Sequence, residues 1–133
     1  MRTLLASLLL LGLGNLRAEL SPDHYRRLQE DAPEALVLQV ADVSSKVTLG
    51  KDGKMTDVAA TATVKSVVRS KSGLKPGDTV RLSYTVITTV VPMPGPSQPK
   101  VLAKDETVRA YLKPVDGAKT LGLAAYGRSF EQP

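Results

Sequence analysis

Residues 58–86, VAATATVKSVVRSKSGLKPGDTVRLSYTV, determine the fold class of this chain. Apolar residues alternate with polar ones on both sides of a central turn. An alternation of period two is typical of strands that bury one face. The central segment 72–78, SGLKPGD, has the composition of a turn. The stretch therefore predicts two antiparallel strands joined by this turn.

The alternation also predicts which side chains of this pair face the core. The inward set comprises Val58, Ala60, Ala62, Val64, Val68, Val80, Leu82, Tyr84 and Val86. Upstream, GKDGK at 50–54 predicts a hairpin turn that joins the pair to a strand starting near residue 34. The apolar positions of that strand change parity, which indicates a bulge near residues 42–45. Downstream, two further strands are expected at about 106–113 and at 120–126.

A short helix is expected before the strands, at residues 20–32. Ser21 is a suitable N-cap, Pro22 fits the first helical position, and Asp23 suits the positive end of the helix dipole. A second non-strand segment, PMPGPSQP at 92–99, contains four prolines and predicts a long, stiff loop.

The expected order is therefore a helical segment at 19–33 followed by a β domain at 34–133. Five antiparallel strands, at least one of them bent, favour a mainly β fold built as a small five-stranded OB-like β-barrel. A β-sandwich is the alternative, but sandwiches usually have seven or more strands.

The N-terminus predicts export. Arg2 precedes an uninterrupted apolar run at 4–13, which is the pattern of a signal peptide at 1–18 with cleavage near Ala18, although cleavage after Gly14 is also compatible. The run is shorter than the roughly 20 residues of a membrane-spanning helix. The mature protein is therefore expected to be secreted or periplasmic, without a transmembrane segment.

The amino-acid composition limits which partners and covalent modifications are expected. The chain has no cysteine, so neither disulfides nor a lipid-modified cysteine can form. Removing residues 1–18 removes two arginines and no acid, so the formal charge falls from +5 to +3. This small excess of positive charge is weak support for an anionic partner.

The segment 61–84, TATVKSVVRSKSGLKPGDTVRLSY, resembles part of the netrin-like modules, which include the N-terminal domain of tissue inhibitors of metalloproteinases. VRAYL at 108–112 followed by Asp116-Gly117 is similar to a later part of that pattern. The resemblance implies an OB barrel and an exported protein-binding module. Those inhibitors chelate zinc through an N-terminal cysteine, and this chain has none, so the resemblance does not imply protease inhibition.

The sequence offers no catalytic set. His24 is the only histidine, and no nucleophile motif, metal-binding motif or phosphate-binding loop accompanies it. Adjacent acidic residues such as Asp105 and Glu106 point to opposite sides of an extended chain. We therefore expect a non-enzymatic protein with no cofactor and no metal site.

Binding is the remaining class. A loop stiffened by prolines loses little entropy when it binds, and tyrosine and arginine are favoured at interfaces. The predicted contact with another protein therefore comprises Met93, Pro94, Pro96, Arg109 and Tyr111. In this interpretation the protein is an exported binding or accessory module.

The alternative site is a basic face formed by Lys65, Arg69 and Arg81, which fall on the outward positions of their strands. This face would suit a carbohydrate or an anionic polymer of the cell envelope. Nucleic acid is not favoured, because single-stranded nucleic acid needs stacking aromatic residues among the charges, and Tyr111 is the one outward candidate.

Overall fold

The computed structural model describes residues 20–91, 94–115 and 120–133. The predicted signal peptide and the turn residues 116–119 lie outside these ranges. The described elements are α2 (Pro22–Asp31), β1 (Glu34–Gly50), β2 (Gly53–Ser70), β3 (Thr79–Thr89), β4 (Thr107–Pro114), β5 (Thr120–Leu123), the short 3-10 helix η1 (Tyr126–Arg128) and β6 (Phe130–Glu131).

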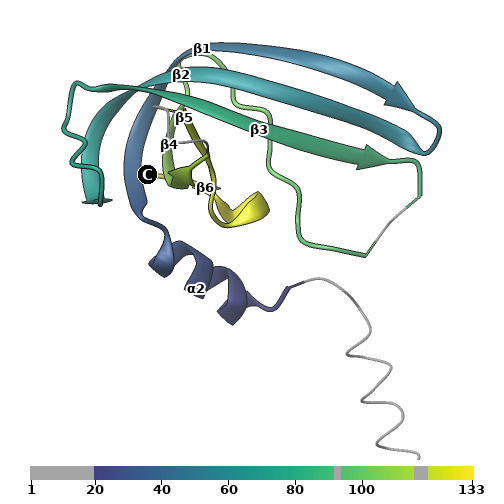
Figure 1. Cartoon of the computed structure of the whole chain (residues 1–133), viewed down its shortest axis with the longest axis horizontal. Helices are drawn as coiled ribbons and strands as arrows, with labels where there is room; N and C mark the ends of the chain where they lie inside the picture. Colours follow the sequence, from purple (N-terminus) through teal and green to yellow (C-terminus); the bar gives the residue numbers. More distant parts are fainter. Residues whose placement is uncertain (1–19, 92–93, 116–119) are drawn as a thin grey trace, which may run out of the picture.

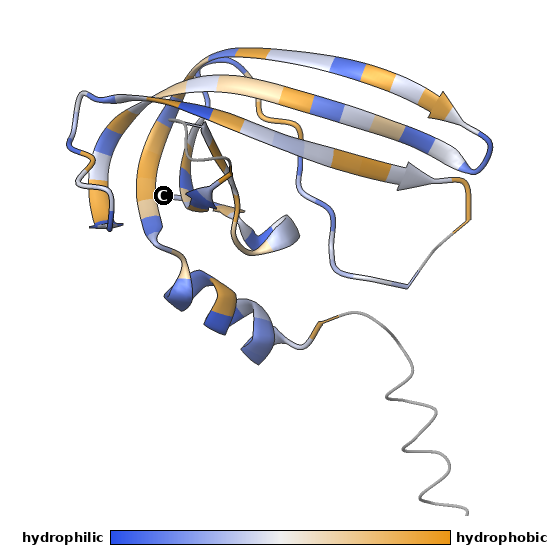
Figure 2. Ribbon diagram, in the orientation of Figure 1, coloured by the Kyte–Doolittle hydropathy of each residue, from blue (hydrophilic) through white to orange (hydrophobic). Residues whose placement is uncertain are grey.

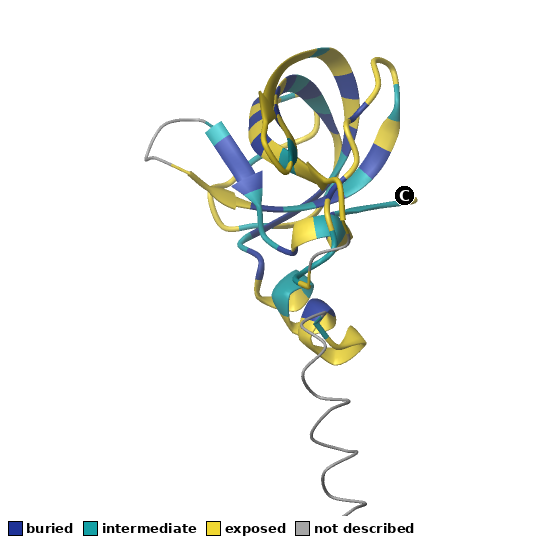
Figure 3. Cartoon of the chain, turned by 90° about the vertical axis from the view of Figure 1, so that its right-hand side faces the viewer, coloured by how far each residue is buried: buried dark blue, intermediate teal, exposed yellow. Residues whose placement is uncertain are grey.

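The described strands form one sheet with the order β1-β2-β3-β5-β4-β6, and β1 also pairs with β4. Five strands therefore close into a ring around the buried interior (Figure 3). All pairs are antiparallel except β3 with β5, which is parallel. The prediction of a mainly β fold with one short N-terminal helix is confirmed, and the sheet is single, whereas a sandwich has two.

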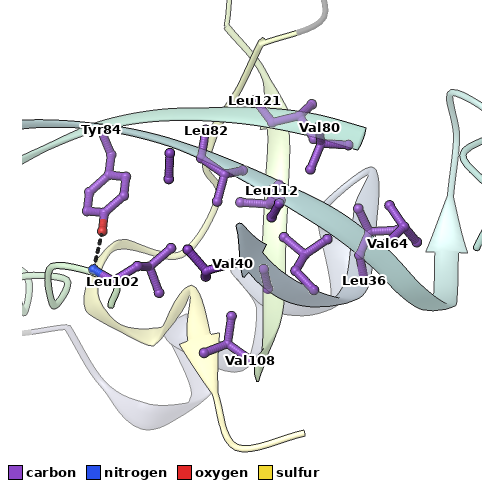
Figure 4. Packing of buried hydrophobic residues seen from close by; sticks show 14 of the residues in the cluster. Leu36, Val40, Val64, Val80, Leu82, Tyr84, Leu102, Val108, Leu112 and Leu121 are labelled. Atoms are coloured by element: carbon purple, nitrogen blue, oxygen red, sulfur yellow. Dashed lines mark hydrogen bonds between the residues drawn. The ribbon is translucent and has the colours of Figure 1, made fainter. Parts of the chain in front are cut away.

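The core lies inside this ring, and alternate residues of the strands fill it. Its largest fully buried apolar side chains are Leu36, Leu38, Leu82, Leu112, Val40, Val58 and Val64. Figure 4 labels Leu36, Val40, Val64, Leu82 and Leu112 among them. The alternation predicted for residues 58–64 and 80–84 is confirmed, since each predicted inward residue there is buried. Val86 is half-buried.

The prediction is wrong at Val68, whose side chain is 56% exposed. The pairing of β1 with β2 shifts register between Val37 and Leu38, where Lys65 of β2 has no partner residue. An extra residue of this kind reverses the side-chain parity of the residues after it. Val67 therefore packs against the core in place of Val68. The bulge in β1 itself falls between Val40 and Asp42, slightly before the predicted position.

The last predicted strand is also shorter than expected. β5 ends at Leu123 because the chain turns into η1, where Tyr126 adopts a positive φ of 50°, a conformation incompatible with a continuing strand. The chain then returns as β6, a short strand that the sequence did not predict. β6 pairs with β4 and places the Phe130 ring edge-to-face against Tyr84, with 5.4 Å between ring centres.

Helix α2 begins as predicted, with the N–H of His24 donating to the Ser21 side chain at 3.2 Å. Its one buried side chain is Tyr25, whose hydroxyl accepts a hydrogen bond from the backbone N–H of Ser97 at 2.7 Å. The helix thus holds the end of the proline-rich segment, although the two are 72 residues apart in the sequence.

Candidate interaction surface

Strands β1, β2 and β3 continue well beyond the closed ring as a three-stranded extension (Figure 1). β4 pairs with β1 only from Glu34 to Gln39, and β5 pairs with β3 only at Arg81 and Leu82. No other described strand pairs with the extension. From Ser44 to Gly50 every residue of β1 is therefore exposed.

The far end of this extension is apolar. We call this surface the apolar end and define it by six side chains that are 45% to 81% exposed: Val47, Leu49, Met55, Ile87, Val90 and Val91. Figure 2 shows hydrophobic segments at the tip of β1, shortly before the tip of β3 and just after β3. Exposed apolar residues are ordinary when scattered, but clustered ones commonly mark an interaction site. Of the six, Leu49, Met55 and Ile87 line one shallow depression together.

The apolar end covers both faces of the sheet. Val47 pairs with Thr56, and Met55 pairs with Ile87. Because side chains alternate between faces along a strand, Val47 lies on the side that faces the core farther along, whereas Met55 and Ile87 lie on the outer side. Both faces of the sheet therefore offer apolar contacts at this end.

One hydrogen bond ties the segment just after β3 to the β1–β2 turn, and a second ties that segment to the end of β3. The N–H of Val90 donates to the carbonyl of Asp52 at 2.9 Å, and the Thr89 hydroxyl donates to the carbonyl of Val91 at 2.6 Å. Gly53 makes this close approach possible, because a Cβ there would overlap the Thr88 carbonyl. The β1–β2 turn and residues 90–91 therefore lie side by side.

The three loop residues of the predicted protein contact differ in exposure. Met93 lies outside the described residues, Pro94 is exposed and Pro96 is half-buried. The end of the loop is anchored by two further hydrogen bonds. The N–H of Gly127 donates to the Ser97 carbonyl at 3.0 Å, and the N–H of Ile87 donates to Oε1 of Gln98 at 2.8 Å. The loop thus contacts α2, η1 and β3.

Arg109 and Tyr111 have different neighbours. Both are half-buried on β4, next to β6. The Tyr111 hydroxyl donates to Oε1 of Glu131 at 3.0 Å. Burial raises the pKa of Tyr111, Glu131 raises it further, and the nearby Arg109 guanidinium opposes the rise. The backbone N–H of Tyr111 donates to the Ser129 carbonyl at 2.8 Å, and its own carbonyl accepts from the N–H of Ala124 at 3.0 Å. Tyr111 is therefore fixed to the segment that runs from the end of β5 to β6.

The residues of the predicted basic face also differ in their roles. The Arg69 guanidinium donates to the carbonyls of Ala32 at 2.8 Å and Gln29 at 2.7 Å, so it completes the C-terminus of α2. Lys65 and Arg81 are exposed. Arg81 borders a depression of about 440 Å³ that also contains Asp42, so the charge around this depression is mixed.

The apolar end was missed by sequence reasoning. The available signal was the alternation of Val47 and Leu49, which predicts an apolar strand face. Whether that face is covered depends on where β4 and β5 stop pairing. Among the described residues, no group of three or more acidic or histidine side chains could hold a metal ion. None of the helices in those ranges is both long enough and apolar enough to cross a membrane.

Comparison of the chain with protein-family models, with curated proteins and with solved structures finds no significant match. The surface chemistry of the chain itself is therefore the basis for assigning a function.

Proposed function

We propose that this chain is an exported, non-enzymatic binding module of OB-like architecture that engages another protein through its apolar end. The single observation that carries the proposal is the gathering of six exposed apolar side chains at the end of a projecting sheet. Burying such a group on association is the dominant favourable term in most protein–protein contacts. Export rests on the N-terminal sequence, Arg2 and the apolar run at 4–13.

Two features support a protein as the partner. The rim of the apolar end carries charges of both signs, Lys51 and Lys54 together with Asp52. An apolar centre with a polar rim is typical of protein interfaces. A surface built on hydrogen-bonded strands also needs little ordering on association, which favours affinity.

The proposed experiment uses the mature domain, beginning near Glu19, as bait in the envelope and medium fractions of the source organism. A protein captured in this way is identified, purified and titrated against three forms of the domain. These are the unmodified domain, a variant with Leu49→Asp and Val90→Asp, and a basic-face variant with Lys65→Glu and Arg81→Glu.

The first variant should bind at least about tenfold more weakly, because two charges would have to enter an apolar contact. Both variants should stay folded, since all four side chains are exposed. If the basic-face variant loses binding instead, and the loss is reproduced by raising the salt concentration, the site is the basic face and the partner is a polyanion.

A further inference from the structure

The edge of β3 that faces away from β2 is open over part of its length. β3 pairs with β2 without interruption from Thr79 to Thr89. On its other edge β5 covers only Arg81 and Leu82. Farther along this edge, the N–H of Ile87 donates to the Gln98 side chain rather than to a strand. The amide oxygen of Gln98 thus occupies the place where a neighbouring strand would put a carbonyl.

Because the N–H of Ile87 points away from β2, the backbone N–H and C=O of Thr85, two residues earlier, must point the same way. In an antiparallel pair, every second residue directs both its N–H and its C=O away from the partner strand. Thr85 therefore presents both groups to the open edge. Among the described residues, no turn or loop backbone bond reaches Thr85, and its hydroxyl donates across the sheet to Asp57 at 2.9 Å.

A groove of about 690 Å³ runs along this open edge. Its opposite wall comprises Pro99, Val115, Leu123 and Tyr126, and Lys113 is the one charged residue of the lining. Tyr126 is 49% exposed and holds a positive φ of 50°. A backbone outlier of this kind often coincides with a functional position, and an exposed tyrosine is a favoured anchor.

Unused sheet edges are normally protected. Proteins place lysine, proline or inward charges on them, or cover them with other elements. The β3 side chains beside the groove, Ser83, Thr85 and Ile87, carry no charge, and Gln98 is a removable cover. An edge that is unpaired at Thr85 and covered at Ile87 only by a side chain suits an extended peptide.

We propose that the groove beside β3 binds an extended peptide segment of the partner protein as an added strand. The inference rests on the proposed function and names the kind of segment that the partner supplies. The open stretch from Tyr84 to Ile87 is about 13 Å long, enough for about four peptide residues. The apolar wall favours aliphatic side chains at alternate peptide positions, and Lys113 favours an acidic residue.

The probe is a set of fluorescein-labelled octapeptides selected on the mature domain from a random phage-displayed library. Thr85→Pro removes the open N–H, and proline is tolerated on strand edges where the N–H faces solvent. Thr85→Val is the matched control, since it keeps the N–H and loses the same hydroxyl. Thr85→Pro should weaken peptide binding about tenfold or more, while Thr85→Val should bind like the unmodified domain.

A second measurement modifies the peptide and so does not depend on the folding of a variant. N-methylation of alternate peptide amides should abolish binding for one set of positions and leave it nearly unchanged for the other, because only one set faces β3. Gln98→Ala should strengthen binding about threefold, because the peptide no longer displaces a side chain.

Several results would overturn the inference: failure of the library to yield a binder, indifference to N-methylation, or equal binding by Thr85→Pro and Thr85→Val. Self-association of the domain that Thr85→Pro abolishes would assign the edge to a second copy instead. Leu49→Asp should not affect octapeptide binding. Loss of native partner binding in that variant therefore reports on the apolar end, and the octapeptide reports separately on the groove.

Discussion

The Tyr84 hydroxyl accepts a hydrogen bond of 3.0 Å from the backbone N–H of Leu102, and both residues are buried (Figure 4). The same hydroxyl donates to the carbonyl of Lys100 at 2.8 Å. One core side chain of β3 thereby fixes the segment that returns from the proline-rich loop to β4. The shape of the loop and the packing of the core are thus linked at a single phenol.

Tyr84→Phe should lower the free energy of unfolding by about 1–3 kcal/mol, because the N–H of Leu102 would be left buried without an acceptor. Urea unfolding of both proteins at neutral pH measures this difference. A loss below about 0.5 kcal/mol would mean that water replaces the hydroxyl.

The same pair predicts a response to alkaline pH. Burial raises the pKa of Tyr84 above its ordinary value of 10.0, although the N–H of Leu102 opposes the rise. A raised pKa in the folded state means that the protonated form is preferred there. Its stabilising contribution is complete below about pH 10 and declines as the pH rises through the folded-state pKa. Unfolding midpoints between about pH 9 and 11.5 should therefore fall more steeply in the unmodified protein than in Tyr84→Phe.

Gly127 gives a second test of how the loop is attached. A Cβ on Gly127 would lie 2.5 Å from Oγ of Ser97 and 2.6 Å from the Gln98 carbonyl oxygen. Gly127→Ala should therefore destabilise the fold by about 1–3 kcal/mol through steric strain. Gly50→Ala is the matched control, since its new Cβ would be 3.5 Å from the nearest atom, and it should change stability by less than about 1 kcal/mol. Equal thermal shifts in the two variants would contradict the described contact.

The register of β2 is tested by two neighbouring residues. Val64 is buried and Lys65 is exposed at the register shift. Val64→Asp should cost about 4 kcal/mol, because an unpaired charge would enter the core. Lys65→Asp should change stability by less than about 1 kcal/mol. Similar unfolding curves for the two variants would show that the register is wrong.

The strand pair at residues 58–86 could be predicted because its two faces differ strongly in polarity, so a period of two fixes the inward set. Val68 could not be placed correctly, because the bulge at Lys65 exists only relative to the partner strand β1. The roles of Arg69 and Ser97 could not be predicted either, since the Arg69–Ala32 and Ser97–Tyr25 hydrogen bonds join residues that are 37 and 72 positions apart.

The exposure of the apolar end could not be predicted from the sequence either, because it depends on long-range strand pairing. The alternation at Val47 and Leu49 predicts a face of a strand, but the exposure of that face depends on where β4 and β5 stop pairing. Whether the loop shares a surface with Arg109 and Tyr111 likewise depends on the path of the loop. Hydrogen bonds to Tyr25, Tyr84 and Gly127 determine that path.

The central claim is that the apolar end contacts another protein, and site-specific photocrosslinking in living cells tests it most directly. A benzophenone amino acid replaces Leu49 in one variant and Lys65, on the basic face, in a control. We expect a discrete covalent adduct with a second protein from position 49 and none from position 65. An adduct from position 65 alone, or no adduct from position 49 in cells that contain the folded protein, would contradict the claim.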